Sequence, residues 1–246
     1  MKKFSLLIFL LFFSIFEGWI SRDAMAIPIG GLDILLDGTY KFDFSYGYVS
    51  KNLEVESNKL YSRSSRFLFE TGYGITNDFN IYGILGMSSF GDKNIDSSFG
   101  FSYGIGTRFS LLGHSHSKPL NIFGKPVSFV ADAKFLSFST HGNSQKTDLE
   151  IDTKWQEGQI AVGGLAESKI WDLFSCICID LTRGHVKTEN DAEINFNEKM
   201  IFGFRIGIYI HKNDNYKFRV ETGVIDENFI SFGASYILSP KKPALY

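Results

Sequence analysis

Features that would assign this chain to a familiar class are lacking. After the first 26 residues no run of 18 apolar residues remains, which excludes membrane-spanning helices. No segment repeats apolar residues at the 3.6-residue period of an amphipathic helix, so a helical fold is not expected. Charge of one sign is lacking too, because 25 basic residues balance 27 acidic ones. We therefore expect no nucleic-acid partner, since such a partner requires a basic face.

The first 26 residues have the pattern of a cleaved signal peptide. Met1-Lys2-Lys3 is basic, residues 4–16 are apolar apart from two serines, and Ala24-Met25-Ala26 offers small residues where a signal peptidase cuts. This apolar run is shorter than the roughly 20 residues that span a bilayer, so we expect cleavage before Ile27 rather than an anchor. No cysteine lies near this junction, which argues against a lipoprotein. The remaining 22 basic and 25 acidic residues give a formal charge of −3 over residues 27–246, one domain or at most two.

What the chain does contain is alternation with a period of two residues. In residues 200–210, large apolar side chains occupy every even position, and Gly203, Arg205, Gly207 and Tyr209 occupy odd ones. A strand points successive side chains to opposite faces, so this segment is a two-faced strand. Similar segments form about ten predicted strands: 39–49, 60–76, 79–90, 98–111, 127–139, 153–166, 170–183, 200–210, 216–225 and 229–238. Aromatic residues are 16% of the chain and glycines number 24, a composition typical of membrane β-barrels.

The polar faces of these strands decide what kind of barrel is expected. They carry seven basic and seven acidic residues among Gly, Ser and Ala: Lys41, Asp43, Arg66, Glu70, Arg108, Asp132, Lys134, Glu157, Asp172, Asp180, Arg205, Lys217, Arg219 and Glu221. Small residues interleaved with balanced charges suit a narrow lumen, where charges neutralise one another. Tyr40, Tyr48, Tyr73, Trp171 and Tyr216 are candidates for aromatic girdles at the membrane interfaces. The soluble alternative is a secreted lipocalin-like barrel, whose apolar faces would point inward around a ligand.

We therefore predict an all-β, antiparallel, up-and-down transmembrane β-barrel of about ten strands, with eight or twelve possible, over residues 27–238. A closed barrel leaves no free sheet edge, so residues 229–238 should pair with residues 39–49. Short turns are expected at residues 76–78 and 211–215, and longer charged loops near residues 50–59, 140–152 and 184–193. Short turns of such barrels face the periplasm and long loops face outward.

The pattern resembles the small bacterial outer-membrane β-barrel proteins, the OmpA-like and porin-like group. The resemblance is carried by residues 66–78, 101–109 and 229–236, and it extends over roughly residues 38–238. It implies an outer-membrane location, contact with outer-membrane lipid and insertion by the barrel-assembly machinery. Members of this group commonly end on an aromatic residue of the last strand. Here Leu238 ends the strand, and residues 239–246, with two prolines, are expected to form a short periplasmic tail.

Several residues could carry chemistry, but each has a plainer interpretation. His114 and His116 could clamp a metal, or lie in a solvated loop. Cys176 and Cys178 share a strand face, where a disulfide would need a distorted strand; small lumen-facing side chains are the alternative. The acidic positions at the outer rim, Asp148, Glu150 and Asp152, could bind Ca²⁺ or act as a base with His141, and Ser144 lies in the same region.

The sequence leads to a ranked set of functional expectations. First comes a monomeric barrel with a charge-filled narrow lumen, either structural or a low-conductance pore, with no catalytic, metal or cofactor site. The second is a surface-binding protein acting through the long loops. The third is a hydrolase at the outer rim, for which His141 and Asp152 are the candidates.

Overall fold

The protein is described by a computed structural model in which residues 31–55, 58–91, 95–112, 120–122, 124–144, 150–188, 193–197, 201–224 and 228–239 are placed. The expected signal peptide, the tail beyond Ser239, and the candidates His114, His116 and Asp148 lie outside these ranges. Within the described residues, no helix is long and apolar enough to cross a membrane.

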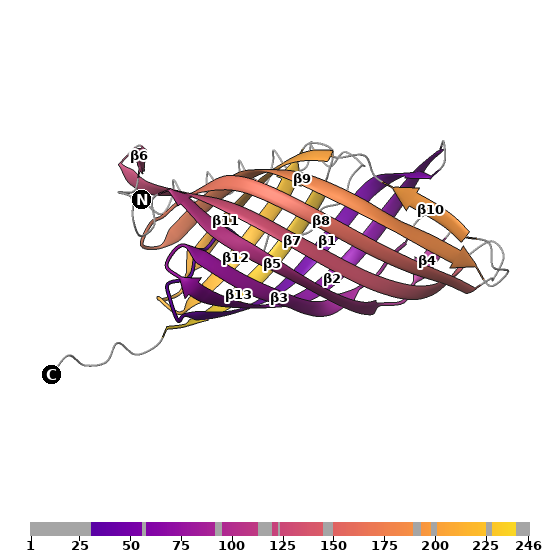
Figure 1. Ribbon diagram of the computed structural model, residues 1–246, viewed down its shortest axis with the longest axis horizontal. Coiled ribbons are helices and arrows are strands. Elements are labelled where there is room, and N and C mark those ends of the chain that lie inside the picture. Colours follow the sequence, from indigo (N-terminus) through magenta and orange to yellow (C-terminus); the bar gives the residue numbers. More distant parts are fainter. Residues whose placement is uncertain are drawn as a thin grey trace, which may run out of the picture.

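Ten antiparallel strands form a closed ring (Figure 1). They are β1 (Tyr40–Val55), β2 (Asn58–Thr76), β3 (Phe79–Ser88), β5 (Gly100–Leu112), β7 (Lys125–Ser144), β8 (Glu150–Ala166), β9 (Trp171–Thr188), β11 (Ile201–His211), β12 (Tyr216–Val224) and β13 (Asn228–Leu238). Each pairs with the barrel strand before and after it in the chain. The predicted pairing of residues 229–238 with residues 39–49 is confirmed, because β13 pairs with β1 from Tyr40 opposite Leu238 to Ser50 opposite Asn228.

Three short strands lie against this ring. They are β4 (Ile95–Ser97), β6 (Leu120–Ile122) and β10 (Glu193–Asn197). β4 and β6 pair with opposite ends of β7, while β10 pairs with β9 and, at one position, with β1. The predicted fold class, an all-β antiparallel up-and-down barrel of about ten strands, is confirmed. We call the end where β1 begins and β13 finishes the terminal end, and the opposite end the far end.

The expected loops near residues 50–59, 140–152 and 184–193 are a wrong prediction, because most of these residues are strand. β1 and β2 stay paired out to Val55 and Asn58, β7 and β8 out to Asn143 opposite Glu150, and β9 runs to Thr188. These segments are charged because their outward faces are polar, and their backbone groups still pair across the sheet. In the described residues of these segments, the polar stretches are continuations of the strands beyond the apolar belt.

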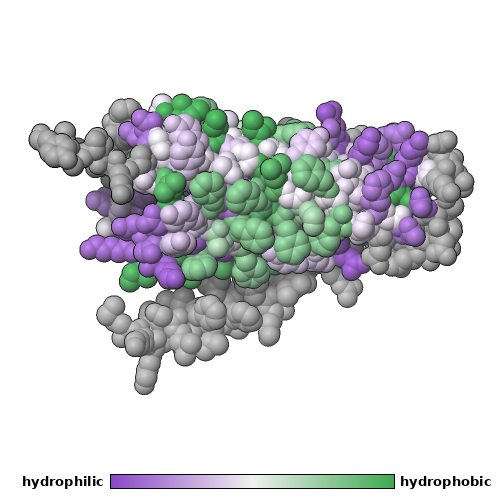
Figure 2. All heavy atoms as spheres, turned by 90° about the horizontal axis from the view of Figure 1, so that it is seen from below, coloured by the Kyte–Doolittle hydropathy of each residue, from purple (hydrophilic) through white to green (hydrophobic). Residues whose placement is uncertain are grey.

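Side chains alternate strictly between the two faces of the ring. Most large apolar side chains are exposed on the outside, while the inside holds charged and small side chains together with groups of buried apolar residues. Figure 2 shows a hydrophobic band around the middle of the molecule with hydrophilic surfaces toward both ends. The band includes Phe44, Phe69, Leu85, Phe101, Ile105, Ile160, Ile177, Phe202, Phe218 and Phe232.

This inside-out arrangement is favourable only in lipid. In water it would expose a continuous apolar surface and bury charge, whereas in a bilayer the apolar belt faces acyl chains and the closed ring pairs every strand. The soluble lipocalin-like alternative is therefore wrong. The protein is a transmembrane β-barrel, and barrels of this build lie in the bacterial outer membrane. Tyr40, Trp171 and Tyr216, three of the girdle candidates, are exposed at the terminal end of the belt.

Candidate functional site: the lumen

The fourteen charged residues expected to line the lumen all lie on the inward face of the barrel, and all except the half-buried Lys217 are buried. We call this set the lumen network; its members are Lys41, Asp43, Arg66, Glu70, Arg108, Asp132, Lys134, Glu157, Asp172, Asp180, Arg205, Lys217, Arg219 and Glu221. Strand parity places them there, since each shares its face with the other inward residues of its strand. The alternation does not predict which of these side chains contact one another.

At the terminal end, the network closes around a residue that the sequence analysis did not include. Asp33 precedes β1, is buried, and accepts hydrogen bonds from Lys41 Nζ at 3.3 Å and Lys217 Nζ at 3.1 Å. Burial disfavours its charged form, but the ammonium groups of Lys217 and Lys41 outweigh that effect and hold the pKa of Asp33 well below its usual range. Lys217 also lies 3.7 Å from Asp172, which contacts His211 Nε2 at 2.7 Å.

Asp33 belongs to a segment that enters the lumen. Leu32 and Leu35 are buried, and Leu32 packs with Val130, Leu165, Phe174 and Tyr209 inside the barrel. The segment is tied to the wall of the barrel where the Gly38 N–H donates to the carbonyl of Gly74 at 2.9 Å. Leu32, Asp33 and Leu35 therefore lie inside the lumen at the terminal end, whereas Leu36 and Asp37 are exposed.

The middle of the lumen is bridged by arginines that hold carboxylates on other strands. Arg108 donates two hydrogen bonds to Glu70, at 2.9 and 3.1 Å, and a third to Asp132 at 2.9 Å. Tyr82 donates to the same Asp132 oxygen at 2.8 Å, and its ring lies 4.2 Å from the Arg108 guanidinium carbon. The result links β2, β3, β5 and β7 through one buried cation.

A second bridge crosses the barrel. Arg66 of β2 donates two hydrogen bonds to Glu157 of β8, at 2.7 and 2.9 Å, although three other strands separate β2 from β8 around the ring. Arg219 of β12 donates two hydrogen bonds to Asp43 of β1, at 3.1 and 3.3 Å. Arg205 donates to Asp180 at 2.8 Å. The Arg66–Glu157 bridge crosses the lumen, whereas Arg205–Asp180 joins the neighbouring strands β11 and β9 along the wall.

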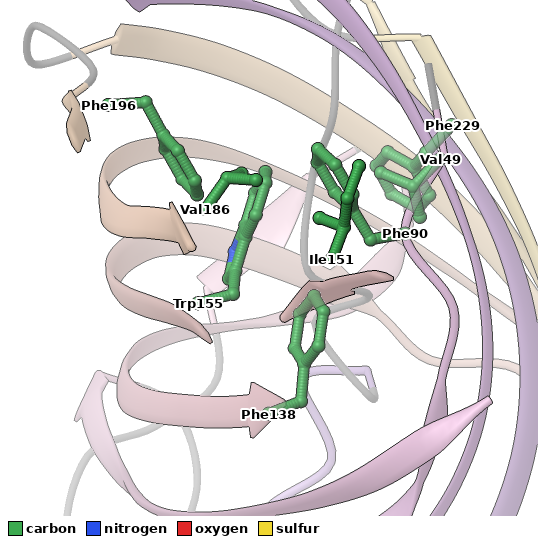
Figure 3. Close-up of a cluster of buried hydrophobic side chains, with 8 residues drawn as sticks. All are labelled: Val49, Phe90, Phe138, Ile151, Trp155, Val186, Phe196 and Phe229. Atoms are coloured by element: carbon green, nitrogen blue, oxygen red, sulfur yellow. The ribbon is translucent and has the colours of Figure 1, made fainter. Parts of the chain in front are cut away.

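The far end of the lumen is closed by apolar side chains. We call this group the aromatic cluster; it consists of Val49, Phe90, Phe138, Ile151, Trp155, Val186, Phe196 and Phe229, all buried (Figure 3). The Trp155 ring centroid lies 5.1 Å from Phe196, 5.6 Å from Phe138 and 5.7 Å from Phe90. Phe90 and Phe196 come from the β3–β4 connection and from β10, outside the ring strands, and reach in to join it.

The aromatic cluster and the lumen network are in contact. The Arg66 guanidinium carbon lies 5.3 Å from the Phe138 ring centroid, and that of Arg205 lies 5.1 Å from the centroid of Phe229. Cation–π contacts of this kind are favourable where water is excluded. The aromatic cluster and the lumen network therefore meet at Arg66 and Arg205.

Sequence parity contained part of the signal for this cluster. Trp155 shares its strand face with Glu157, and Phe138 shares its face with Lys134, so both were bound to point inward. Phe90 and Phe196 carried no such signal, because neither lies in a long alternating strand. The position of Asp33 could not be predicted either, because the short segment before the first strand shows no alternation of apolar and polar residues.

The other sequence candidates are placed as follows. Cys176 and Cys178 are buried on the inward face and form no disulfide with each other. His141 and Asp152 sit opposite each other on β7 and β8 at the far end, with Nδ1 of the histidine contacting a carboxylate oxygen, and both side chains are exposed. Glu150 is exposed on the same strand as Asp152. Within the placed residues, no three or more His, Cys, Asp or Glu side chains are grouped so as to hold a metal ion.

Comparison with known proteins gives likeness of architecture alone. No protein-family model matches the chain, and no curated protein matches it. Among solved structures it is similar to the translocator domain of the autotransporter NalP from Neisseria meningitidis, with 9% identity, 85% of this chain and 91% of that one covered, and a TM-score of 0.47. It is also similar to the outer membrane protease OmpT from Escherichia coli, with 9% identity, 86% and 100% covered, and a TM-score of 0.49. A third is Ail, the attachment invasion locus protein of Yersinia pestis, with 11% identity, 82% and 100% covered, and a TM-score of 0.36.

Proposed function

We propose that this protein is a monomeric outer-membrane barrel whose lumen is closed in its resting form, so that it acts as a structural barrel or passes only very small solutes. The observation that carries the proposal is a pair of obstructions inside the ring: an ion pair that crosses the lumen and the buried aromatic cluster beyond it. The bidentate Arg66–Glu157 pair crosses the interior, and Trp155, which contacts no solvent, sits beyond it. Small barrels of eight or so strands have interiors that side chains can fill, whereas conducting porins have many more strands.

The single-chain ring supports the monomeric part of the proposal. β1 pairs with both β2 and β13, so the ring closes without a second copy. An edge strand, which would invite pairing with another chain, is thereby removed. The belt of apolar side chains makes lipid the partner of the outer wall.

Planar-bilayer recording of the refolded protein tests the proposal. The native protein is expected to show no large steady conductance. Trp155→Ala combined with Phe138→Ala, which empties much of the aromatic cluster, should produce more frequent or larger current steps than the native protein. The control is Phe135→Ala, a change of the same kind on the outward face of β7, which should leave the current unchanged. A large steady conductance of the native protein would overturn the closed-lumen proposal.

We further propose that the protein has no enzymatic activity at its rim. His141 and Asp152 are both well exposed, and general-base catalysis gains most from groups held in a site that excludes water. The hydroxyl of Ser98 donates to the carbonyl oxygen of His141 at 2.7 Å, so it is directed at the backbone rather than at the imidazole. Hydrolysis of a peptide or ester panel by the native protein that is lost in both His141→Ala and Asp152→Asn would contradict this proposal.

A further inference from the structure

The outer wall of the barrel carries a hollow at the edge of the apolar belt, on strands β5, β7, β8, β9 and β10. This groove has a volume of about 460 Å³. We call it the wall groove. Its basic residues are Lys154, Arg183 and His185, and none of the described residues that line it is acidic.

Strand register shows how the groove is made. One row across the sheet places Ser137 of β7 opposite Gln156 of β8, and Gln156 opposite Arg183 of β9. The next row toward the far end places Ser139 opposite Lys154, and Lys154 opposite His185. The serines of β7 are short and form the floor, while the long side chains of β8 and β9 form a side wall.

The groove lies at the level where the outward face changes from apolar to polar. The row on its other side, toward the terminal end, places Phe135 opposite Gly158, and Gly158 opposite Leu181. Phe135 and Leu181 are exposed, and a Cβ added at Gly158 would meet no atom within 4 Å. A gap between the exposed side chains of Phe135 and Leu181 therefore adjoins the groove at Gly158.

Charge at the groove is available for a ligand. Arg183 donates from Nε to Gln156 Oε1 at 3.0 Å, a neutral partner that leaves its charge uncompensated. Within the described part of the chain, the side chain of Lys154 makes no hydrogen bond or ion pair. Asp152 and Glu193 lie in the next row of the sheet toward the far end, outside the lining of the groove. The nearer of them, Glu193, is 4.0 Å from His185.

We infer that the wall groove binds the phosphate headgroup of a membrane lipid, with an acyl chain of that lipid lying over Gly158. Lys154 and Arg183 supply the positive charge, and the guanidinium fork suits phosphate oxygens. Tyr103, half-exposed at the edge of the groove, has the amphipathic ring that favours the headgroup level. The groove lies on the far-end side of the apolar belt, so the lipid belongs to the leaflet at that end of the barrel.

Native mass spectrometry of the refolded protein in detergent tests this inference. The probes are phosphatidic acid and the diacylglycerol with the same chains, which differ only in the phosphate. The native protein should retain phosphatidic acid in preference to diacylglycerol. Lys154→Gln combined with Arg183→Gln should weaken retention about tenfold, since each removes one partly exposed charge contact. Equal retention of the two lipids, or unchanged retention in the double variant, would overturn the inference.

Two further variants separate binding from folding. Lys169→Gln with Lys212→Gln removes two exposed lysines at the terminal end and should leave retention unchanged. Lys154→Arg with Arg183→Lys keeps both charges and should restore most of it. A shift in gel migration on heating shows that each variant is folded. Inorganic phosphate added at the concentration of the lipid should not displace it; displacement by the free ion would show a simple anion site and overturn the assignment to lipid. This outcome is independent of whether the lumen conducts.

Discussion

The cross-barrel pair Arg66–Glu157 offers the sharpest test of how the lumen is held together. Glu157→Gln keeps the shape of the side chain and removes its charge. The Arg66 side chain has no exposure and that of Glu157 only 4%, so the guanidinium would remain buried with Ser64 Oγ, 3.1 Å from its Nε, and the Phe138 ring as neutral neighbours. Removing one partner of a buried pair typically costs about 3–5 kcal/mol, because the remaining charge is left uncompensated.

The second half of this test is the double variant. Arg66→Met in the Glu157→Gln background removes the stranded charge, so stability should return to within about 1–2 kcal/mol of the native protein. Arg66→Met alone completes the cycle and should also cost about 3–5 kcal/mol, because it removes the other partner of the buried pair. The coupling energy is then about 4 kcal/mol or more, above the range of about 0.5–3 kcal/mol usual for side chains in contact. The assay is urea unfolding in lipid vesicles followed by tryptophan fluorescence, with free energies compared at equal lipid composition.

A matched control makes the result interpretable. Asp152→Asn makes the same carboxylate-to-amide change in the exposed contact with His141, whose side chains are 59% and 81% exposed. Exposed pairs contribute about 0–1 kcal/mol, so this variant should lose little. If Glu157→Gln loses no more stability than Asp152→Asn, or if the double variant is as unstable as the single one, the charge bridge does not hold the lumen as argued.

Two other perturbations follow from the same packing. Gly106→Ala should cost about 1–3 kcal/mol in the same unfolding assay, because its Cβ would overlap the Tyr82 ring, while Gly83→Ala, whose Cβ meets nothing within 4 Å, should be neutral. Asp33→Asn should change how stability depends on pH. The pKa of Asp33 is depressed chiefly by Lys217 against the effect of burial, so its contribution is present above the unfolded value of about 4 and is lost as pH falls below it. The variant should be less stable than the native protein at neutral pH, and the difference should shrink in acid; a constant difference would contradict the assignment.

The sequence could predict the sidedness of nearly every strand residue, because sidedness is local. Alternation alone placed Arg66 and Glu157 inside and Phe135 outside. It could not pair Arg66 with Glu157, since that contact exists only once the ring has closed and brought β2 opposite β8. Thr140 and Thr153 lie opposite each other in the β7–β8 pair. The sequence could not predict whether this region is strand or loop, because polar residues exposed to water are common in both.

The closed lumen bears on where this protein can act. Ion pairs and aromatic rings occupy the interior, and displacing either costs free energy of unfolding. A ligand that binds the outside of the ring does not have to displace them. The outward faces of β7, β8 and β9 continue beyond the apolar belt and carry charged side chains such as Lys154, Arg183 and Lys187 at the membrane boundary. The proposed lipid site lies on these faces. A rigid sheet holds such side chains at fixed spacing, and this favours recognition of a fixed headgroup over adaptive binding by loops.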